Sequence, residues 1–428
     1  MHFNTFLYMF GLDPDNFVNE LVEPIESDAG VIVYILRQRI DKRLCPECGC
    51  NDAEINNYYF TETNFTTNEG KPILIRIKKV RFKCHVCNKT FTPNINGIER
   101  YSRIGKQVET LMIRRFYKQG SFSYIGDEYG LSKSETMKLF DKTFPYVERG
   151  PIPTALCIDE IGFKSEDGSY AAIIYDHDKR IVTDVIRNRQ KEYLRSYFYH
   201  YSFKERQRVK YFISDLYEGY ASIKEEFFKD AIHIADMFHV IRLLKAEVSR
   251  LRIRTYKEYT SDGDVERAFM KLHWDYFEKF LDKETAYKPY YCKKERFEYS
   301  TWNMMRRCLE INQTFWDAYV CLQDFYEYYR CQSFDQAIKH IEKVVNQLKK
   351  TGDEELGRVA NTYHKWRNEI ANAITVRNEN GKRYSNGPAE GLNNAIKTLI
   401  KDANGYKNFE RFRKRALLIL GKRKDPSQ

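Results

Sequence analysis

The chain has 428 residues, enough for about three domains of ordinary size. Its 71 Lys and Arg residues exceed its 60 Asp and Glu residues and give a net charge of +11, which favours a polyanionic partner. The composition, 42% hydrophobic and 31% charged, excludes a disordered chain, and the sequence shows neither an apolar run of membrane-spanning length nor a secretory signal. We therefore expect a cytoplasmic protein without a membrane partner.

Half of the ten cysteines fall within residues 45–87, and four of these five form two C-x-x-C knuckles. The knuckles are Cys45-Pro-Glu-Cys48 and Cys84-His-Val-Cys87, and the chain between them contains the strand-like run PILIRIKKVRFK. Two such knuckles can supply four thiolates to one tetrahedral Zn²⁺, which leaves no open position for catalysis. The spacing therefore predicts a structural zinc site on a zinc ribbon.

Two alternatives stay open for this cluster. Cys50 gives the first knuckle the form C-x-x-C-x-C, so it can replace Cys45 or Cys48, and His85 is a weaker substitute. A redox pair or scattered buried thiols would also account for the cysteines, but a redox motif needs one C-x-x-C rather than two.

Residues 71–90 carry seven Lys or Arg residues and no acidic residue. Such a run is often only a solvated face. On a small zinc ribbon, a strand of one charge sign favours contact with phosphates instead. The residues that we expect to bind DNA here are Lys78, Lys79 and Arg81.

The segment FSYIGDEYGLSKSETMKLF at residues 122–140 has the pattern of a helix-turn-helix. Gly126 allows close helix packing, Gly130 begins the turn, and Ser132 with Glu135 forms a capping box for the second helix. An ordinary pair of helices is the alternative, and the preceding basic strand favours DNA binding. The side chains expected to face outward, near the helix end that enters a major groove, are Lys133, Ser134 and Lys138.

After Pro151 and Pro153, which mark a linker, the pattern changes to short apolar runs. The runs TALCIDEIGF, YAAIIYD and RIVTDVIRN predict a three-stranded antiparallel meander. The segments KEYLRSYFYHY and EGYASIKEEFF are helical in pattern and alternate with the strands VKYFIS and AIHIAD. The order βββαβαβ is an α/β arrangement.

The next part of the chain predicts long helices. Residues 264–351 contain no glycine, and Pro289 is the only proline between Pro153 and Pro388. In residues 334–350 apolar side chains recur at helical spacing, Ser333 caps the start and Gly352 can end the helix. We expect an all-α block that interrupts the α/β domain.

Two aspartates end apolar strands, Asp159 after Leu156–Ile158 and Asp215 after Phe212–Ser214. Each alone is weak evidence, since such residues often begin turns. If the strands are neighbours, both carboxylates lie at one sheet edge and can bridge divalent cations such as Mg²⁺, which suits attack at phosphorus. Glu390, in the first turn of a helix after Pro388, is the best third ligand, whereas Glu160 points to the opposite strand face.

These residues resemble the motifs of the DDE-type transposases of bacterial insertion sequences, specifically the ISL-three family. The likeness covers nearly the whole chain in the expected order. The motifs are Ile158-Asp159-Glu160, Ser214-Asp215-Leu216-Tyr217-Glu218-Gly219-Tyr220, Ala235-Asp236-Met237-Phe238-His239-Val240 and Ser385-Asn386-Gly387-Pro388-Ala389-Glu390-Gly391-Leu392-Asn393-Asn394.

The resemblance implies a multidomain protein whose α/β catalytic domain is RNase H-like and interrupted by the all-α insertion. It also implies that Asp159, Asp215 and Glu390 are the catalytic triad and hold Mg²⁺ or Mn²⁺. The expected parts are the zinc-ribbon region 1–100, the helix-turn-helix domain 101–150, the first catalytic part 151–245, the insertion 246–380, and the last catalytic part 381–428 with the Glu-bearing helix and a basic tail.

Two further groups have supporting roles. Asp236 and His239, three residues apart at a helix start, can pair and brace the active-site edge, and direct metal ligation is the weaker alternative. Lys397 and Lys401 open a basic C-terminal run that can hold DNA backbone near Glu390. An exposed basic helix is the alternative for that run.

By this resemblance the protein is a nucleoid-associated transposase that binds double-stranded DNA, both the terminal inverted repeats of its element and the target. It would cut and join DNA as a homodimer or larger assembly. Two other classes stay open: a non-catalytic DNA-binding regulator derived from a transposase, and an RNase H-like nuclease without strand transfer. Three carboxylates beside DNA phosphates argue against the regulator, because without metal they repel DNA.

Overall fold

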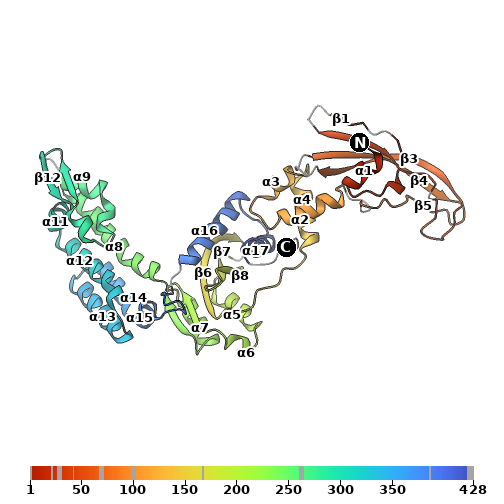
Figure 1. The fold of residues 1–428 in the computed structure, drawn as a ribbon. Helices are drawn as coiled ribbons and strands as arrows, with labels where there is room; N and C mark the ends of the chain where they lie inside the picture. The colour runs from red at the N-terminus through yellow and green to blue at the C-terminus, as the bar shows by residue number, and fades with distance from the viewer. Residues whose placement is uncertain are drawn as a thin grey trace. The chain divides into compact units, whose positions relative to one another are not determined.

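A computed structural model describes residues 2–20, 23–26, 31–41, 43–66, 72–98, 103–165, 168–259, 265–384 and 387–421. The chain forms two compact units. The first unit contains Met1–Glu148 and Ala395–Gln428, and the second contains Arg149–Asn394. Figure 1 gives the elements of both.

The first unit begins with α1 (Phe3–Met9) and a 3-10 turn, η1 (Pro14–Asn16), followed by a five-stranded sheet. The sheet order is β1-β2-β4-β3, and β5 also pairs with β4. The strands are β1 (Ile25–Glu26), β2 (Ile32–Arg37), β3 (Ala53–Thr66), β4 (Pro72–Cys84) and β5 (Thr90–Phe91). The antiparallel β3–β4 pair is the long ribbon of this unit (Figure 1) and ends at the two cysteine knuckles.

Three helices follow the sheet: α2 (Lys106–Arg115), α3 (Phe122–Asp127) and α4 (Lys133–Thr143). The predicted capping box is confirmed, because the Glu135 N–H donates to Ser132 Oγ and the Ser132 N–H donates to the Glu135 carboxylate. Gly126 is required where α3 approaches the turn, since a Cβ there would lie 2.5 Å from the carbonyl oxygen of Leu131.

The C-terminal helix α17 (Phe409–Leu420) packs on these three helices. Arg415 is fully buried and donates hydrogen bonds to the carbonyl oxygens of Phe116, Lys118 and Gly120. Arg411 forms an ion pair with Asp141 at 2.6 Å. Through these contacts residues 395–421 belong to the first unit.

The second unit is built on a five-stranded sheet of order β10-β9-β6-β7-β8. The strands are β6 (Ala155–Ser165), β7 (Gly168–Asp176), β8 (Ile181–Ile186), β9 (Tyr211–Ser214) and β10 (Ile232–Ala235). Strands β6, β7 and β8 form the predicted antiparallel meander, and β9 and β10 extend the sheet in parallel with β6. The helices among them are α5 (Lys191–Tyr199), α6 (Phe203–Arg206) and α7 (Glu218–Phe227).

A largely helical block follows β10. Its helices are α8 (Met237–Glu258), α9 (Val265–Leu272), α10 (Lys283–Tyr287), α11 (Thr301–Glu310), α12 (Gln313–Tyr326), α13 (Phe334–Lys350), α14 (Glu354–Lys365) and α15 (Arg367–Thr375), with the 3-10 turns η2 (Trp274–Phe277) and η3 (Glu327–Arg330). The helix predicted over 334–350 is confirmed, including its Ser333 cap.

The prediction of an all-α block is wrong at one place. Strands β11 (Pro289–Cys292) and β12 (Phe297–Ser300) form an antiparallel hairpin. Pro289 cannot continue a helix, and the aromatic residues after it favour extended backbone. Arg296, at φ 52°, supplies the turn. The absence of glycine from residues 264–351 therefore does not mean that the whole segment is helical.

The block returns to the sheet through α15. Asn372 Nδ2 donates to the backbone oxygen of His233 in β10 at 2.8 Å, and Trp366 lies edge-on against the His233 ring. The chain then enters α16 (Gly387–Asp402), whose first residues, up to Asn394, belong to the second unit. The motif residues Ser385 and Asn386 lie outside the described residues.

Candidate functional site

Three aspartates lie just beyond the parallel-paired stretches of three adjacent strands in the second unit. Asp215 and Asp236 directly follow β9 and β10. The prediction that Asp159 ends its strand is wrong, because β6 continues to Ser165 and only its pairing with β9 stops, at Cys157. Strands β6 and β9 are in register at Cys157 and Ile213, so Asp159 and Asp215 each lie two residues further along. Asp236 directly follows β10, and its N–H donates to the Ser214 carbonyl at 2.7 Å. Parallel strands place their carboxyl ends at one sheet edge, so the register brings these carboxylates to the same side of the sheet.

Burial and mutual repulsion both affect the carboxylates of Asp159 and Asp215. Asp159 is only 6% exposed. Burial raises the pKa of Asp215, the negative charge of Asp159 adds to that rise, and the N–H of Tyr217, donating at 3.0 Å, opposes it. Buried like charges of this kind are costly without a nearby cation. The donor set is all oxygen, which fits Mg²⁺ or Mn²⁺.

His239 is a titratable group at this edge. Its Nδ1 lies 2.6 Å from the Asp236 carboxylate, and this hydrogen bond raises the pKa of the imidazole, with further contributions from Asp159 and Asp215. Asp236 also caps α8 by accepting the N–H of Phe238. The pair proposed from the sequence is therefore formed, and it lies within electrostatic reach of both other aspartates.

Helix α16 is joined to the first of these aspartates through Asn393. Its Nδ2 donates to Asp159 Oδ2 at 2.7 Å, and its Oδ1 accepts the hydroxyl of the buried Tyr175. The other oxygen of Asp159 accepts the N–H of Glu160 at 2.8 Å. Glu390 is one helical turn before Asn393, hence on the same helix face, and its side chain is exposed.

We expect Asn393→Ala to weaken Mn²⁺ binding by about 10–100-fold, the usual cost of losing a residue that orients a metal ligand. Without the amide, Asp159 loses the donor that fixes one of its oxygens. The measurement is a Mn²⁺ titration of the full chain followed by electron paramagnetic resonance.

Tyr175→Phe removes only the hydroxyl that orients the Asn393 amide. It should therefore also weaken Mn²⁺ binding, but by less than Asn393→Ala does. Asn393→Gln should restore part of the affinity if its amide reaches Asp159. Unchanged Mn²⁺ affinity in Asn393→Ala would contradict the role given to this residue.

Arg189 is a neighbour of the site that the sequence reasoning missed. Its guanidinium lies 4.7 Å from the ring centroid of Tyr170 and 4.8 Å from that of Tyr217 and pairs with the Glu160 carboxylate. Its charge also lowers the pKa of Asp215 against the effect of burial. No local pattern marks an arginine just after a strand, so only the fold reveals this position.

The four predicted cysteine ligands meet in the first unit. The sulfur atoms of Cys45 and Cys87 are 3.6 Å apart and those of Cys48 and Cys84 are 3.5 Å apart, and all four lie within 4.8 Å of one another. A tetrahedral Zn²⁺ with bonds of about 2.3 Å needs sulfur atoms roughly 3.8 Å apart. The geometry therefore fits one zinc ion.

Two further observations bear on this cysteine group. The backbone N–H of Cys87 lowers the pKa of the Cys84 thiol to about 7, whereas the pKa values of the Cys48 and Cys87 thiols are raised, so Cys84 forms the thiolate that binds metal more readily than these two. The alternative ligand Cys50 lies outside the group, and its sulfur accepts the N–H of Asp52 at 3.3 Å.

The carboxylates Asp159, Asp215 and Glu390 are not gathered in the same way. Within the described ranges, the cysteine group is the one in which three or more ligand atoms converge closely enough to hold a metal ion. Two of the three carboxylates lie at one sheet edge, and the third lies on the helix joined to that edge by Asn393.

The residues expected to bind DNA lie on the surface of the first unit. Lys133, Ser134 and Lys138 are exposed on α4, and Lys397 and Lys401 are exposed on the second half of α16. Lys78 lies over the Tyr58 ring at 4.9 Å and Arg81 over the Tyr59 ring at 5.1 Å, whereas the head of Lys79 is half-buried.

Comparison with known proteins identifies the family. A search among curated proteins found no match. In the described residues no helix has the length and apolar character needed to cross a membrane. A family model described as a transposase, of the DDE type and the ISL-three family, matches residues 156–416, more than half of the chain. This match contains Asp159, Asp215 and the helix of Glu390, and the chain belongs to the ISL-three family of DDE transposases.

Proposed function

We propose that this transposase binds the terminal inverted repeats of its insertion sequence and cuts and joins DNA at an Asp159/Asp215/Glu390 site. One observation carries the proposal: buried Asp159 lies beside Asp215 on parallel strands and is hydrogen-bonded through Asn393 to the helix of Glu390. A binding protein gains nothing from burying like charges together, whereas a metal-dependent enzyme needs them.

The proposed organisation follows from the same residues. The Cys₄ group supports a zinc ribbon in 1–100, and α2–α4 support a helix-turn-helix in 101–150. The sheet of the second unit supports an RNase H-like fold formed by 151–245 and by the part of 381–428 that belongs to this unit, up to Asn394, around the insertion 246–380. The exposed basic residues on α4, β4 and α16 would contact DNA, and joining two DNA ends calls for a dimer or a larger assembly.

Mg²⁺ or Mn²⁺ bound by the three carboxylates would activate water, and later the freed 3′-hydroxyl, and would stabilise the leaving oxygen. The protein groups do the rest. Asn393 holds Asp159 in one orientation, and the Asp236–His239 pair braces the end of β10 and the start of α8. Arg189, which lies over two tyrosine rings and pairs with Glu160, adds a positive charge that offsets part of the charge of Asp215.

The test is an end-cleavage assay with the full chain, Mg²⁺ or Mn²⁺, and DNA carrying the element end joined to flanking sequence. We expect cleavage at the element boundary that leaves a 3′-hydroxyl, followed by joining of that end to a second duplex. Cleavage without joining would favour the nuclease. Binding to the end without any cleavage would favour the regulator and overturn the catalytic proposal.

A further inference from the structure

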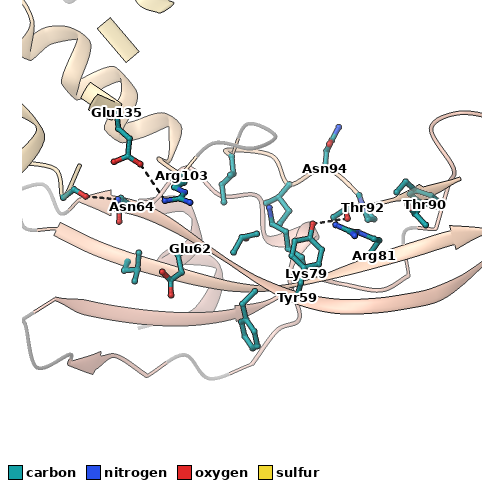
Figure 2. Close-up of a pocket in the computed structure, with 18 residues that line it drawn as sticks. Tyr59, Glu62, Asn64, Lys79, Arg81, Thr90, Thr92, Asn94, Arg103 and Glu135 are labelled. Atoms are coloured by element: carbon teal, nitrogen blue, oxygen red, sulfur yellow. Dashed lines mark hydrogen bonds and ion pairs between the residues drawn. The ribbon is translucent and has the colours of Figure 1, made fainter. Parts of the chain in front are cut away.

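The β3–β4 ribbon and the turn before α4 line one polar groove in the first unit. Its volume is about 870 Å³. Figure 2 shows Tyr59, Lys79 and Arg81 on the strands at one side of the groove, with Arg103 and Glu135 at the other. The residues of the zinc-ribbon region and of the helical region therefore share a single concave surface.

This surface is held together by backbone contacts rather than by side chains alone. The amide of Asn64 in β3 donates to the Gly130 carbonyl at 3.2 Å. The Asn64 backbone also exchanges hydrogen bonds with Arg103 and Gly105, at 2.8 and 2.9 Å. Gly105 fits closely against Phe65, where a Cβ would lie 2.1 Å from the ring. The ribbon and the turn before α4 are thus fixed to each other.

The charge of the groove is unbalanced. Its two acidic residues are already engaged, Glu62 by Arg76 and Glu135 by the capping hydrogen bonds of Ser132. Neither Lys79 nor Arg81 has a carboxylate partner in the part of the chain that the structure describes. Burial lowers the pKa of Lys79, so the ammonium is kept out of water without a compensating charge.

Neutral polar groups surround these two cations. Tyr59 and Thr92 are joined by a hydrogen bond between their hydroxyl groups at 3.1 Å, and Thr90 and Asn94 also line the groove. Hydroxyl, amide and guanidinium groups in one concave, positively charged surface are the groups that contact DNA phosphates. A protein partner would need acidic groups spaced to match, and nothing in the groove favours that over a DNA strand.

We propose that this groove binds the sugar-phosphate backbone of the same duplex whose major groove receives α4. Lys79 and Arg81 would each neutralise a phosphate, while the exposed residues of α4 contact bases. The zinc ribbon and the helix-turn-helix then bind one continuous DNA site rather than two separate ones. This inference rests on the proposed DNA binding and adds that Lys79 and Arg81 contact the same duplex as α4, through the groove between them.

The salt dependence of binding tests this directly. For B-DNA, the slope of log K against log salt concentration has a magnitude of about 0.9 for each phosphate that the protein neutralises. The double variant Lys79→Gln/Arg81→Gln should therefore reduce the magnitude of the slope by about 1.8. Discrimination between element-end DNA and scrambled DNA should stay unchanged, since phosphate contacts carry no sequence information.

Lys83→Gln is the matched control, because Lys83 is exposed on the same strand and does not line the groove. It should leave the slope as in the unchanged protein. Zinc content and thermal midpoint show that each variant is folded. Replacing single phosphates by neutral methylphosphonates should weaken the unchanged protein but not the double variant at the contacted positions.

The possible outcomes distinguish the proposal that DNA occupies this groove from the proposal that the protein binds DNA at all. If the unchanged protein binds the end DNA and the double variant keeps the full slope, the groove assignment is wrong while DNA binding stands. Failure of the unchanged protein to bind any DNA overturns both. Tighter binding to RNA of the same sequence would also overturn the assignment to duplex DNA.

Discussion

We expect Asp215→Asn to abolish DNA cleavage at the element end and to leave end binding intact. The neutral amide cannot bridge a divalent cation as a carboxylate does, and loss of one such electrostatic stabiliser costs at least about 10²–10³-fold in rate. Asp159→Asn and Glu390→Gln should give the same result. The measurement is single-turnover cleavage of labelled end DNA in Mg²⁺, with binding followed in Ca²⁺.

The same substitution should stabilise the metal-free protein at neutral pH. Burial raises the pKa of Asp215, so the folded state favours the protonated acid, and the stability that this gives is lost as the pH rises through the folded-state pKa. At pH 7 the charge is therefore a cost that asparagine removes. A gain of roughly 1 kcal/mol would raise the melting midpoint of this unit by about 2–4 °C.

The control is Asp230→Asn, which neutralises an exposed carboxylate just before β10 and should change neither cleavage nor stability. Near pH 3, below the unfolded-state pKa, Asp215→Asn and the unchanged protein should melt alike. Added Mn²⁺ should raise the midpoint of the unchanged protein only. Normal cleavage by Asp215→Asn would refute the assignment of the metal site.

Local patterns in the sequence predicted much of the fold. The capping box of Ser132 and Glu135, the meander of β6–β8 and the helix over 334–350 each depend on residues close together in the chain. The two C-x-x-C knuckles that begin at Cys45 and Cys84 could likewise be predicted as zinc ligands from their spacing alone. In such segments, the contacts form between residues that are close in the chain, so the residue pattern predicts them directly.

The parts that were missed depend on contacts between distant residues. Asn393 meets Asp159 across 234 positions of sequence, and Tyr175 joins them from another strand. Arg415 lies in a basic run whose pattern is that of an exposed helix, yet it is fully buried and satisfies three carbonyl groups. No local periodicity separates an arginine that binds carbonyls from one that faces DNA.

The contacts of individual basic residues show which of them are already paired within the fold. Arg411 and Arg415 are used to hold α17 on the first unit, so they are not available to phosphates. In contrast, Lys79 and Arg81 face the groove without a carboxylate partner among the described residues. The net charge of +11 does not show which basic residues are free to meet a polyanion. Part of the C-terminal positive charge is used within the fold, whereas the two basic residues of β4 that line the groove are not paired with carboxylates in the described part of the chain.

Removing zinc should unfold the knuckle end of the first unit and weaken DNA binding. The apolar cluster there is small, formed by Ala53, Val80, Phe82 and Phe91 beside the cysteines. Zinc binding in comparable small sites contributes about 10–16 kcal/mol to folding, far more than such a cluster can. Cys84→Ser should therefore lose one zinc per chain, measured by mass spectrometry, and its β3–β5 amides should exchange rapidly.

Cys50→Ser provides the matched control, because its sulfur lies outside the ligand group and accepts only a backbone N–H. This variant should keep its zinc and its affinity for end DNA. The second unit should melt at the same temperature in both variants, since its sheet and helices contain none of the four ligands. Loss of zinc in Cys50→Ser with retention in Cys84→Ser would show that the ligand set was assigned wrongly. If both variants keep zinc and fold normally, Cys84 is not a required zinc ligand, and the rigidity of the groove lined by Lys79 and Arg81 does not depend on it.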